Sequence, residues 1–152
     1  MYKRVLVPVD GSELSEAIVP FILEIAGPLD LAVVLLLVQP PEPPITEVAV
    51  RVVEDGDIAA RHYLGELAAT MERKGVRVQA RVRRGRPVDE ILAAAREEGV
   101  DMIAMTTHGR TGPGRLLFGS VAEGVLRHAD VPVFLMRQAA ADLARGGDGA
   151  RR

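Results

Sequence analysis

The chain has 152 residues, the length of one ordinary domain, and its 19 basic and 21 acidic side chains leave a formal net charge of −2. Hydrophobic residues make up 48% and aromatic residues 3% of the chain, so we expect an aliphatic core of the kind found in α/β proteins with buried parallel strands. The balanced charge provides no general attraction to nucleic acid, and the absence of cysteine excludes disulfides, thiol nucleophiles and cysteine-ligated zinc.

Two apolar stretches bear on membrane association. The first, Val5 to Val9, is too short to be the apolar core of a signal peptide. The longest, Leu31 to Val38, falls far below the roughly 20 residues that a transmembrane helix needs. We therefore expect a cytoplasmic protein with neither a membrane nor nucleic acid as its partner.

The first third of the chain predicts a strand, a helix and a second strand. Lys3 to Val9 is a nearly continuous apolar run, and the turn residues Asp10-Gly11-Ser12 close it. Glu13 to Ala26 has helical apolar spacing, with a bend expected at Pro20 because proline removes a backbone hydrogen bond. Leu31 to Val38 is wholly apolar and predicts a buried strand.

The middle of the chain begins with a proline-rich loop, Gln39 to Pro44. The residues from there to about Val53 have a strand-like composition and no clear assignment. Asp55 to Lys74 predicts a helix that ends at Gly75. Val76 to Arg83 alternates apolar and polar residues, which indicates a strand with one solvated face at the edge of a sheet.

The last part predicts a helix over Pro87 to Glu98, a strand over Val100 to Met105, a helix over Val121 to His128 and a strand over Val131 to Met136. Strands and helices thus alternate along residues 1–137, and residues 138–152 are expected to form a flexible tail. Such alternation predicts an α/β protein with a single-domain, open, five-stranded parallel sheet that carries helices on both faces.

Open parallel sheets bind ligands beyond the carboxyl ends of their strands, where the strand order reverses. The loop after the fourth predicted strand, Thr106 to Ser120, has glycines at 109, 112, 114 and 119 and leads into a helix. Glycine lets backbone N–H groups approach an anion, and the helix start favours a phosphate. Ser120 and Glu123 also fit a capping box, so a purely structural loop remains an equal alternative.

Asp10, which follows the first predicted strand, has two interpretations. It lies at the predicted crevice and could contact a ligand there. It also precedes Glu13 by three residues, the spacing of an N-cap for the first helix. We favour the ligand role.

Five arginines lie close together on or after the edge strand, at positions 77, 81, 83, 84 and 86. A solvated edge strand is the simpler explanation for this basic stripe. Arg86, next to Gly85, could also reach a phosphate.

The chain resembles the universal stress protein family over about Met1 to Arg137. The resemblance is carried by the opening Arg4 to Ser12, by Gly85-Arg86-Pro87, by Gly119 to Glu123 and by Ala129 to Val133. The family's signature is a glycine, two residues, a second glycine, nine residues, then glycine and Ser or Thr. Gly109 and Gly119-Ser120 match its last two elements, whereas Thr106 replaces the first glycine.

The resemblance implies a Rossmann-like, adenine nucleotide alpha hydrolase-like fold with strand order 3-2-1-4-5. In nucleotide-binding members, the residues that match the strand ends surround adenine and ribose, and those that match the signature surround the phosphates. The first group here is Pro8, Val9, Asp10 and Val38, and the second is Gly109, Arg110, Gly119, Ser120 and Val121. Met105 and Thr106 complete the predicted ATP site, where the Thr106 side chain would either narrow the space or add a hydrogen bond.

Three functional hypotheses follow: a nucleotide-binding stress-response or signalling protein, a dimeric interaction module that binds no nucleotide, and an enzyme. The enzyme is the weakest, because no nucleophile is paired with a base and no Walker lysine follows the glycines. ATP hydrolysis, if any, should be slow. Any Mg²⁺ or Mn²⁺ would be held largely by phosphate oxygens and water.

We also expect a homodimer formed through Val131 to Met136, because an apolar edge strand favours pairing with a second copy.

Overall fold

The computed structural model describes residues 1–42, 47–107 and 119–137. Gly109, Arg110 and the predicted tail therefore lie outside the described residues. The elements in chain order are β1 (Arg4–Val9), α1 (Glu13–Glu16), α2 (Val19–Ala26), β2 (Ala32–Gln39), α3 (Glu47–Glu72), β3 (Arg77–Arg84), α4 (Pro87–Glu97), β4 (Met102–Thr107), α5 (Ser120–His128) and β5 (Val133–Arg137).

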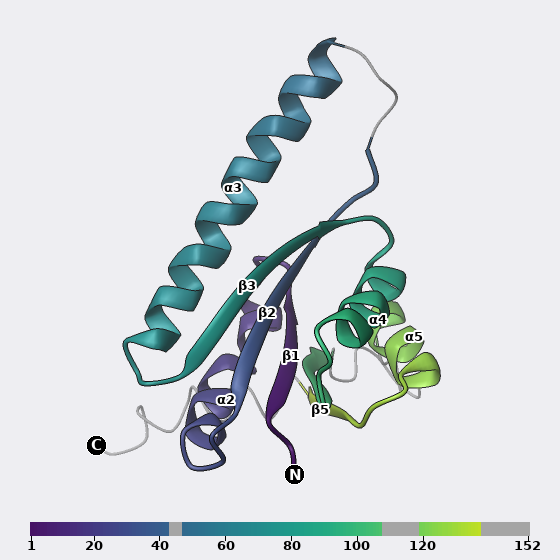
Figure 1. Cartoon of the computed structure of the whole chain (residues 1–152). Coiled ribbons are helices and arrows are strands. Elements are labelled where there is room, and N and C mark those ends of the chain that lie inside the picture. Colours follow the sequence, from purple (N-terminus) through teal and green to yellow (C-terminus); the bar gives the residue numbers. More distant parts are fainter. Residues whose placement is uncertain (43–46, 108–118, 138–152) are drawn as a thin grey trace, which may run out of the picture.

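The strands form one five-stranded parallel sheet in the order β3-β2-β1-β4-β5 (Figure 1). This confirms the predicted fold class and strand order. It also confirms that β3, the strand with alternating residues, lies at a sheet edge. β1 and β2 are central and nearly all apolar, because both of their faces are covered.

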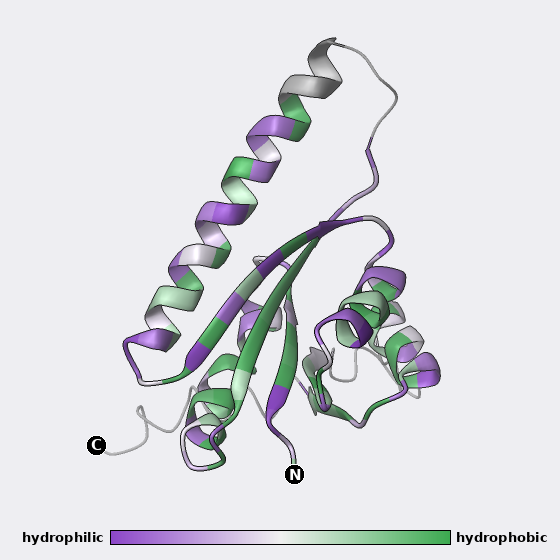
Figure 2. Cartoon of the chain, in the orientation of Figure 1, coloured by the Kyte–Doolittle hydropathy of each residue, from purple (hydrophilic) through white to green (hydrophobic). Residues whose placement is uncertain are grey.

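The two faces of the sheet carry separate hydrophobic cores, and successive residues of β1 alternate between them. Val5 and Val7 pack in the first core with residues of α2 and α3, such as Ile22 and Leu64. Leu6 packs in the second core with residues of α4 and α5. Figure 2 shows the apolar strands between these two helical layers.

The predicted helix over Glu13 to Ala26 is wrong in one respect, because the structure has two helices in its place. α1 ends at Glu16 and α2 begins at Val19, with Pro20 in its first turn. The physical reason is that proline is tolerated in a first turn, where its missing N–H would have no helical partner. The break therefore lies before Pro20 and replaces the expected bend.

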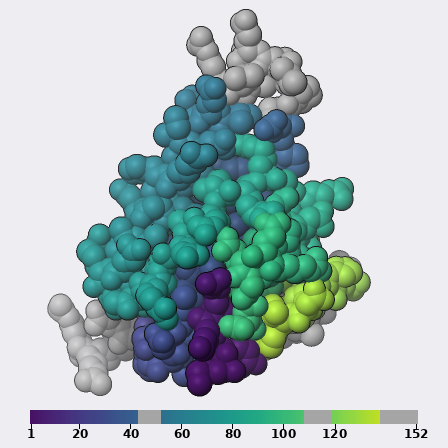
Figure 3. All heavy atoms as spheres, in the orientation of Figure 1, coloured from purple at the N-terminus to yellow at the C-terminus, as the bar shows by residue number. Residues whose placement is uncertain are grey.

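The segment left without an assignment is helical in its described part, and α3 begins at Glu47 instead of Asp55. Its valines suggested a strand, but their helix propensity is only slightly below that of other residues, so the surrounding structure can override it. The amino-terminal part of α3 extends beyond the sheet in Figure 1, and Figure 3 shows the atoms of α3 along one side of the molecule. The last two strands also begin two residues later than predicted, which places Thr106 inside β4 and not in a loop.

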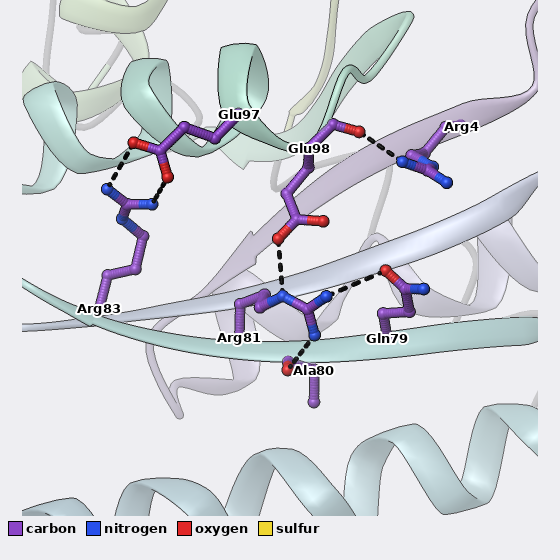
Figure 4. Close-up of polar contacts among 7 residues, drawn as sticks. All are labelled: Arg4, Gln79, Ala80, Arg81, Arg83, Glu97 and Glu98. Atoms are coloured by element: carbon purple, nitrogen blue, oxygen red, sulfur yellow. Dashed lines mark hydrogen bonds and ion pairs between the residues drawn. The ribbon is translucent and has the colours of Figure 1, made fainter.

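The arginines of β3 are ion-paired, as expected for a solvated edge strand. The Arg83 guanidinium lies 2.6 Å from both Glu90 and Glu97 of α4, and hydrogen bonds to these carboxylates raise its pKa. Arg81 pairs with Glu98, whose backbone oxygen also accepts a hydrogen bond from Arg4 (Figure 4). These contacts fix the end of α4 against the sheet.

Candidate functional site

A cleft of about 240 Å³ lies beyond the carboxyl ends of β1, β2 and β4, between α1, α4 and α5. The neighbours of β1 are β2 on one side and β4 on the other, so the strand order reverses at this position. This is the location at which open α/β sheets bind ligands. The described residues that line it are Pro8, Val9, Asp10, Ser12, Leu14, Ser15, Leu36, Val38, Pro87, Ile91, Met105, Thr106, Thr107, Gly119, Ser120, Val121 and Ala122.

Part of the cleft lining is apolar and continuous with the second hydrophobic core. Leu36, Ile91 and Met105 are buried members of that core, and Val38 packs against it. Such side chains can enclose a flat, weakly polar group such as a nucleobase but offer it no ionic contact. This part of the cleft therefore favours an aromatic ring.

The Asp10 loop forms a polar side of the cleft. The Asp10 carboxylate accepts a hydrogen bond from the Ser12 N–H at 2.9 Å, and the Ser12 hydroxyl accepts one from the Ser15 N–H at 3.1 Å. Ser12, and not Asp10, is therefore the N-cap of α1. Partial burial tends to raise the pKa of Asp10, but hydrogen bonds from Ser12 and Ser15 outweigh it and hold the pKa below its ordinary value. Asp10 is thus an ionised hydrogen-bond acceptor at the cleft.

The N-terminus of α5 forms a second polar side. Gly119 is the N-cap and Ser120 is the first helical residue, so the capping box proposed for Ser120 and Glu123 is not formed. Thr107, a buried threonine of β4, accepts a hydrogen bond from the Gly119 N–H at 3.3 Å. The next residues, Ser120 to Ala122, line the cleft. Because N–H groups of a first helical turn have no acceptor within the helix, this end can bind an anion.

Thr106 lines the cleft, but its hydroxyl is not presented to it. The Oγ1 atom is buried and has no hydrogen-bond partner among the described residues. A buried hydroxyl without a partner costs about 1–3 kcal/mol, because the group has lost its hydrogen bonds to water. The side chain therefore narrows the site without offering its oxygen to a ligand in this conformation.

We expect Thr106→Val to raise the free energy of unfolding by about 1 kcal/mol, because valine keeps the shape and removes a buried hydroxyl that has no partner in the described part of the chain. Urea denaturation of the two proteins measures the difference. Thr106→Ser is the matched control, since it keeps the hydroxyl and should give no gain. A valine variant less stable than the parent would show that the hydroxyl has a partner.

Nine of the eleven predicted site residues line this one cleft: Pro8, Val9, Asp10, Val38, Met105, Thr106, Gly119, Ser120 and Val121. The other two, Gly109 and Arg110, lie outside the described residues. The remaining lining residues were not predicted as site residues. Pro87 belongs to a motif already noted, and Ile91 follows it by one helical turn, so helical periodicity could have placed both at the cleft.

No group of three or more histidine, aspartate or glutamate side chains in the described part of the chain could hold a metal ion. Within residues 1–42, 47–107 and 119–137, no helix combines the length and the apolar character needed to cross a membrane.

The family model described as "Universal stress protein family" matches residues 1–137. The chain belongs to the universal stress protein family. A universal stress protein of Methanocaldococcus jannaschii is 30% identical over 146 residues, which cover 91% of this chain and 84% of the relative. The resemblance inferred from the sequence motifs is thereby confirmed.

Solved universal stress proteins share the fold described above. The structure of protein MJ0577 is 29% identical, covers 91% of this chain and 97% of its own, and superposes with a TM-score of 0.74. A member from Arabidopsis thaliana with AMP bound is 21% identical, with coverages of 92% and 94% and a TM-score of 0.67. A member from Archaeoglobus fulgidus was solved in complex with dAMP, at 21% identity, coverages of 88% and 97% and a TM-score of 0.65.

Proposed function

We propose that this universal stress protein binds ATP in the cleft and acts in the cytoplasm as a nucleotide-dependent stress-response or signalling protein. The observation that carries the proposal is the pairing, in one cleft, of an apolar wall with two polar sides. Leu36 and Val38 suit the adenine ring, the ionised Asp10 suits a ribose hydroxyl, and the α5 N-terminus suits the phosphates. The adenine nucleotides named for the solved relatives agree in chemical class.

The test is to purify the protein without added nucleotide, denature it, and assay the supernatant for ATP and ADP. Thermal shift with millimolar ATP and Mg²⁺ covers the case of an empty site, because a ligand that binds only the native state raises the melting temperature. A protein that releases no nucleotide and shows no shift would refute ATP binding. That outcome would favour the alternative, a dimeric interaction module that binds no nucleotide.

The chemistry of the cleft supports binding more than catalysis. Mg²⁺ or Mn²⁺ would be held by phosphate oxygens and water, since the described residues offer no cluster of metal ligands. Asp10 already accepts a hydrogen bond from Ser12, and its lowered pKa makes it a poor general base. We therefore propose that any hydrolysis of ATP is slow, with turnover well below about 1 per second, the lower end of typical enzyme rates.

We also propose that the protein forms a homodimer through β5. In the described part of the chain β5 is a terminal strand of the sheet and pairs only with β4. Its apolar residues Val133 to Met136 are half-buried, so their exposed parts and the free backbone edge could pair with a second copy.

Leu135→Glu is expected to convert this dimer to a monomer, because a charge on the strand would be desolvated at the interface. Size-exclusion chromatography with light scattering measures the mass. Glu substitution at Val52, an exposed apolar residue of α3, is the control and should leave the dimer intact. A Leu135→Glu protein that stays folded and dimeric would place the interface elsewhere.

A further inference from the structure

We infer that Tyr63 of α3 is a positioning residue for the cleft: through its hydrogen bond to Glu16 it holds α1, one side of the cleft, in the ligand-binding position. The inference rests on the proposed nucleotide site for its functional consequence. Its structural part, the anchoring of α1 by α3, stands on the contacts of these two helices alone.

α1 has four residues, none of them buried, and the chain leaves the helical path before α2 begins. Ile18 and Val19, which follow it, are buried in the first core, whereas the position of the turn itself depends on contacts of its own side chains. Two of its residues, Leu14 and Ser15, nevertheless line the cleft, together with the N-cap Ser12. A single turn of helix is unstable without tertiary contacts, because the conformational entropy lost in fixing the first turn outweighs the free energy of the one hydrogen bond that it forms. The side of the cleft that it forms therefore depends on the tertiary contacts of α1.

α3, in contrast, is firmly fixed to the sheet. Its residues Ala60, Leu64 and Met71 are buried in the first core. The middle of the helix is also tied to the carboxyl ends of neighbouring strands, because the Gln39 side chain donates to the Gly56 backbone oxygen at 2.9 Å and Arg84 pairs with Asp57. α3 is thus held to the sheet by contacts that do not involve α1.

The Tyr63 hydroxyl joins the two helices. It donates to Glu16 Oε1 at 2.6 Å, a short distance typical of a hydrogen bond to an ionised carboxylate. The main cause of the raised pKa of Tyr63 is burial. The hydrogen bond to Glu16 raises this pKa further, and so do the negative charges of Glu16 and Asp10. Tyr63 therefore stays protonated and remains a donor across the physiological pH range. Glu16 is the last residue of α1, so the bond fixes the position of that end relative to α3.

Contacts of neighbouring residues in α1 connect Tyr63 to the Asp10 loop of the cleft. The Ser15 hydroxyl, one residue before Glu16, accepts a hydrogen bond from the Asp10 N–H at 3.1 Å. Displacement of α1 would therefore disturb the loop that orients Asp10. Tyr63 is not among the residues that line the cleft, so its effect on a ligand is indirect. It acts through Glu16 and through a backbone hydrogen bond with Gly11, the residue after Asp10.

The test combines two measurements on Tyr63→Phe, which keeps the ring and removes the hydroxyl. By calorimetry we expect the Kd for ATP to rise about tenfold, equivalent to about 1.4 kcal/mol. By hydrogen exchange we expect the amides of residues 14–17 to exchange several-fold faster, with those of β1 and β2 unchanged. Tyr2→Phe is the matched control, because Tyr2 is the other tyrosine of the chain and lies exposed at the N-terminus.

Variants at Glu16 separate a positioning contact from a general loss of packing. Glu16→Gln keeps an oxygen acceptor and should stay within about threefold of the parent, whereas Glu16→Ala should match Tyr63→Phe. The double variant should lose no more than Tyr63→Phe alone, since Glu16 has no tyrosine hydroxyl left to accept from once Tyr63 is replaced.

The two proposals fail in different ways. If the parent protein binds no ATP while Tyr63→Phe still accelerates exchange in α1, the nucleotide site is refuted and the anchoring of α1 stands. If the parent binds ATP and the Tyr63→Phe and Glu16→Ala proteins bind it equally well, the positioning role is refuted. Unchanged exchange at residues 14–17 would overturn the inference regardless of ligand.

Discussion

Ser120→Glu is expected to weaken ATP binding by at least about tenfold and to leave the melting temperature unchanged or slightly higher. Ser120 is the exposed first residue of α5 and lines the cleft. A carboxylate there would lie where the proposed phosphates bind, and two like charges a few ångströms apart near a protein surface repel by about 4 kcal/mol before screening by salt. The same carboxylate is favourable at a helix N-terminus, by about 0.3–1 kcal/mol, so the fold should not suffer.

The matched control is Ser120→Gln, which has nearly the same size without the charge. Calorimetry with adenosine and with ATP separates the contribution of the nucleoside from that of the phosphates. The Glu variant should bind adenosine as the parent does, and for ATP it should lose only the affinity that the phosphates contribute. Equal affinity of the Glu and Gln variants for ATP would show that the phosphates do not lie at the α5 N-terminus. Higher salt should reduce the difference between these two variants, because exposed charges are screened.

Gly124→Val is expected to lower the free energy of unfolding by about 2–3 kcal/mol, through overpacking between α4 and α5. An ideal Cβ at Gly124 would lie 2.8 Å and 3.1 Å from the two Cγ atoms of Val88, which is closer than such atoms pack. Val88 is β-branched, so its side chain has few alternative rotamers in the helix. The two helices would have to separate, and chemical denaturation of both proteins measures the cost.

The double variant Gly124→Val with Val88→Ala should recover at least half of that loss, because it removes the atoms that clash. The cleft supplies a second readout. α4 contributes Pro87 and Ile91 to its lining and α5 contributes Ser120 to Ala122, so separation of the helices should also weaken ATP binding. A Gly124→Val protein as stable as the parent would mean that α4 and α5 do not approach as closely as described.

The prediction of the fold from the sequence succeeded where one physical signal dominated. The apolar runs of β1 and β2 have both faces buried, so their pattern required no knowledge of neighbours. The alternating residues of β3 indicated an edge strand, because alternation shows directly that one face of the strand is in contact with solvent. The helix start at Glu47 and the break before Pro20 were missed. In the first case valine-rich residues can form a strand or a helix, and in the second proline can bend a helix or begin a new one. In both cases the local preference is weak and the rest of the structure decides.

The residues of the candidate site were predicted from turn chemistry and family motifs more than from composition. Asp10 lies beside a glycine after the end of β1, and Ser120 lies beside a glycine at the start of α5. The strand order brings both to one cleft. Ser12, Thr107 and Ile91 were not predicted, because serine and threonine are common in any loop and a buried isoleucine suggests only a core. Their place at the cleft depends on the meeting of α1, α4 and β4 in the folded chain.

By itself, the amino-acid sequence determined the α/β class, the edge position of β3 and the family, because hydrophobic period and motif spacing are properties of the chain alone. The tertiary structure decided the roles of individual groups. Ser12 and not Asp10 caps α1, Ser120 begins α5 without capping it, and the Thr106 hydroxyl is enclosed. It also joined Tyr63 to Glu16, 47 positions apart in the chain. The physical reason is that a hydrogen bond requires two groups at about 3 Å, and only the packing of helices on the sheet brings them to that distance.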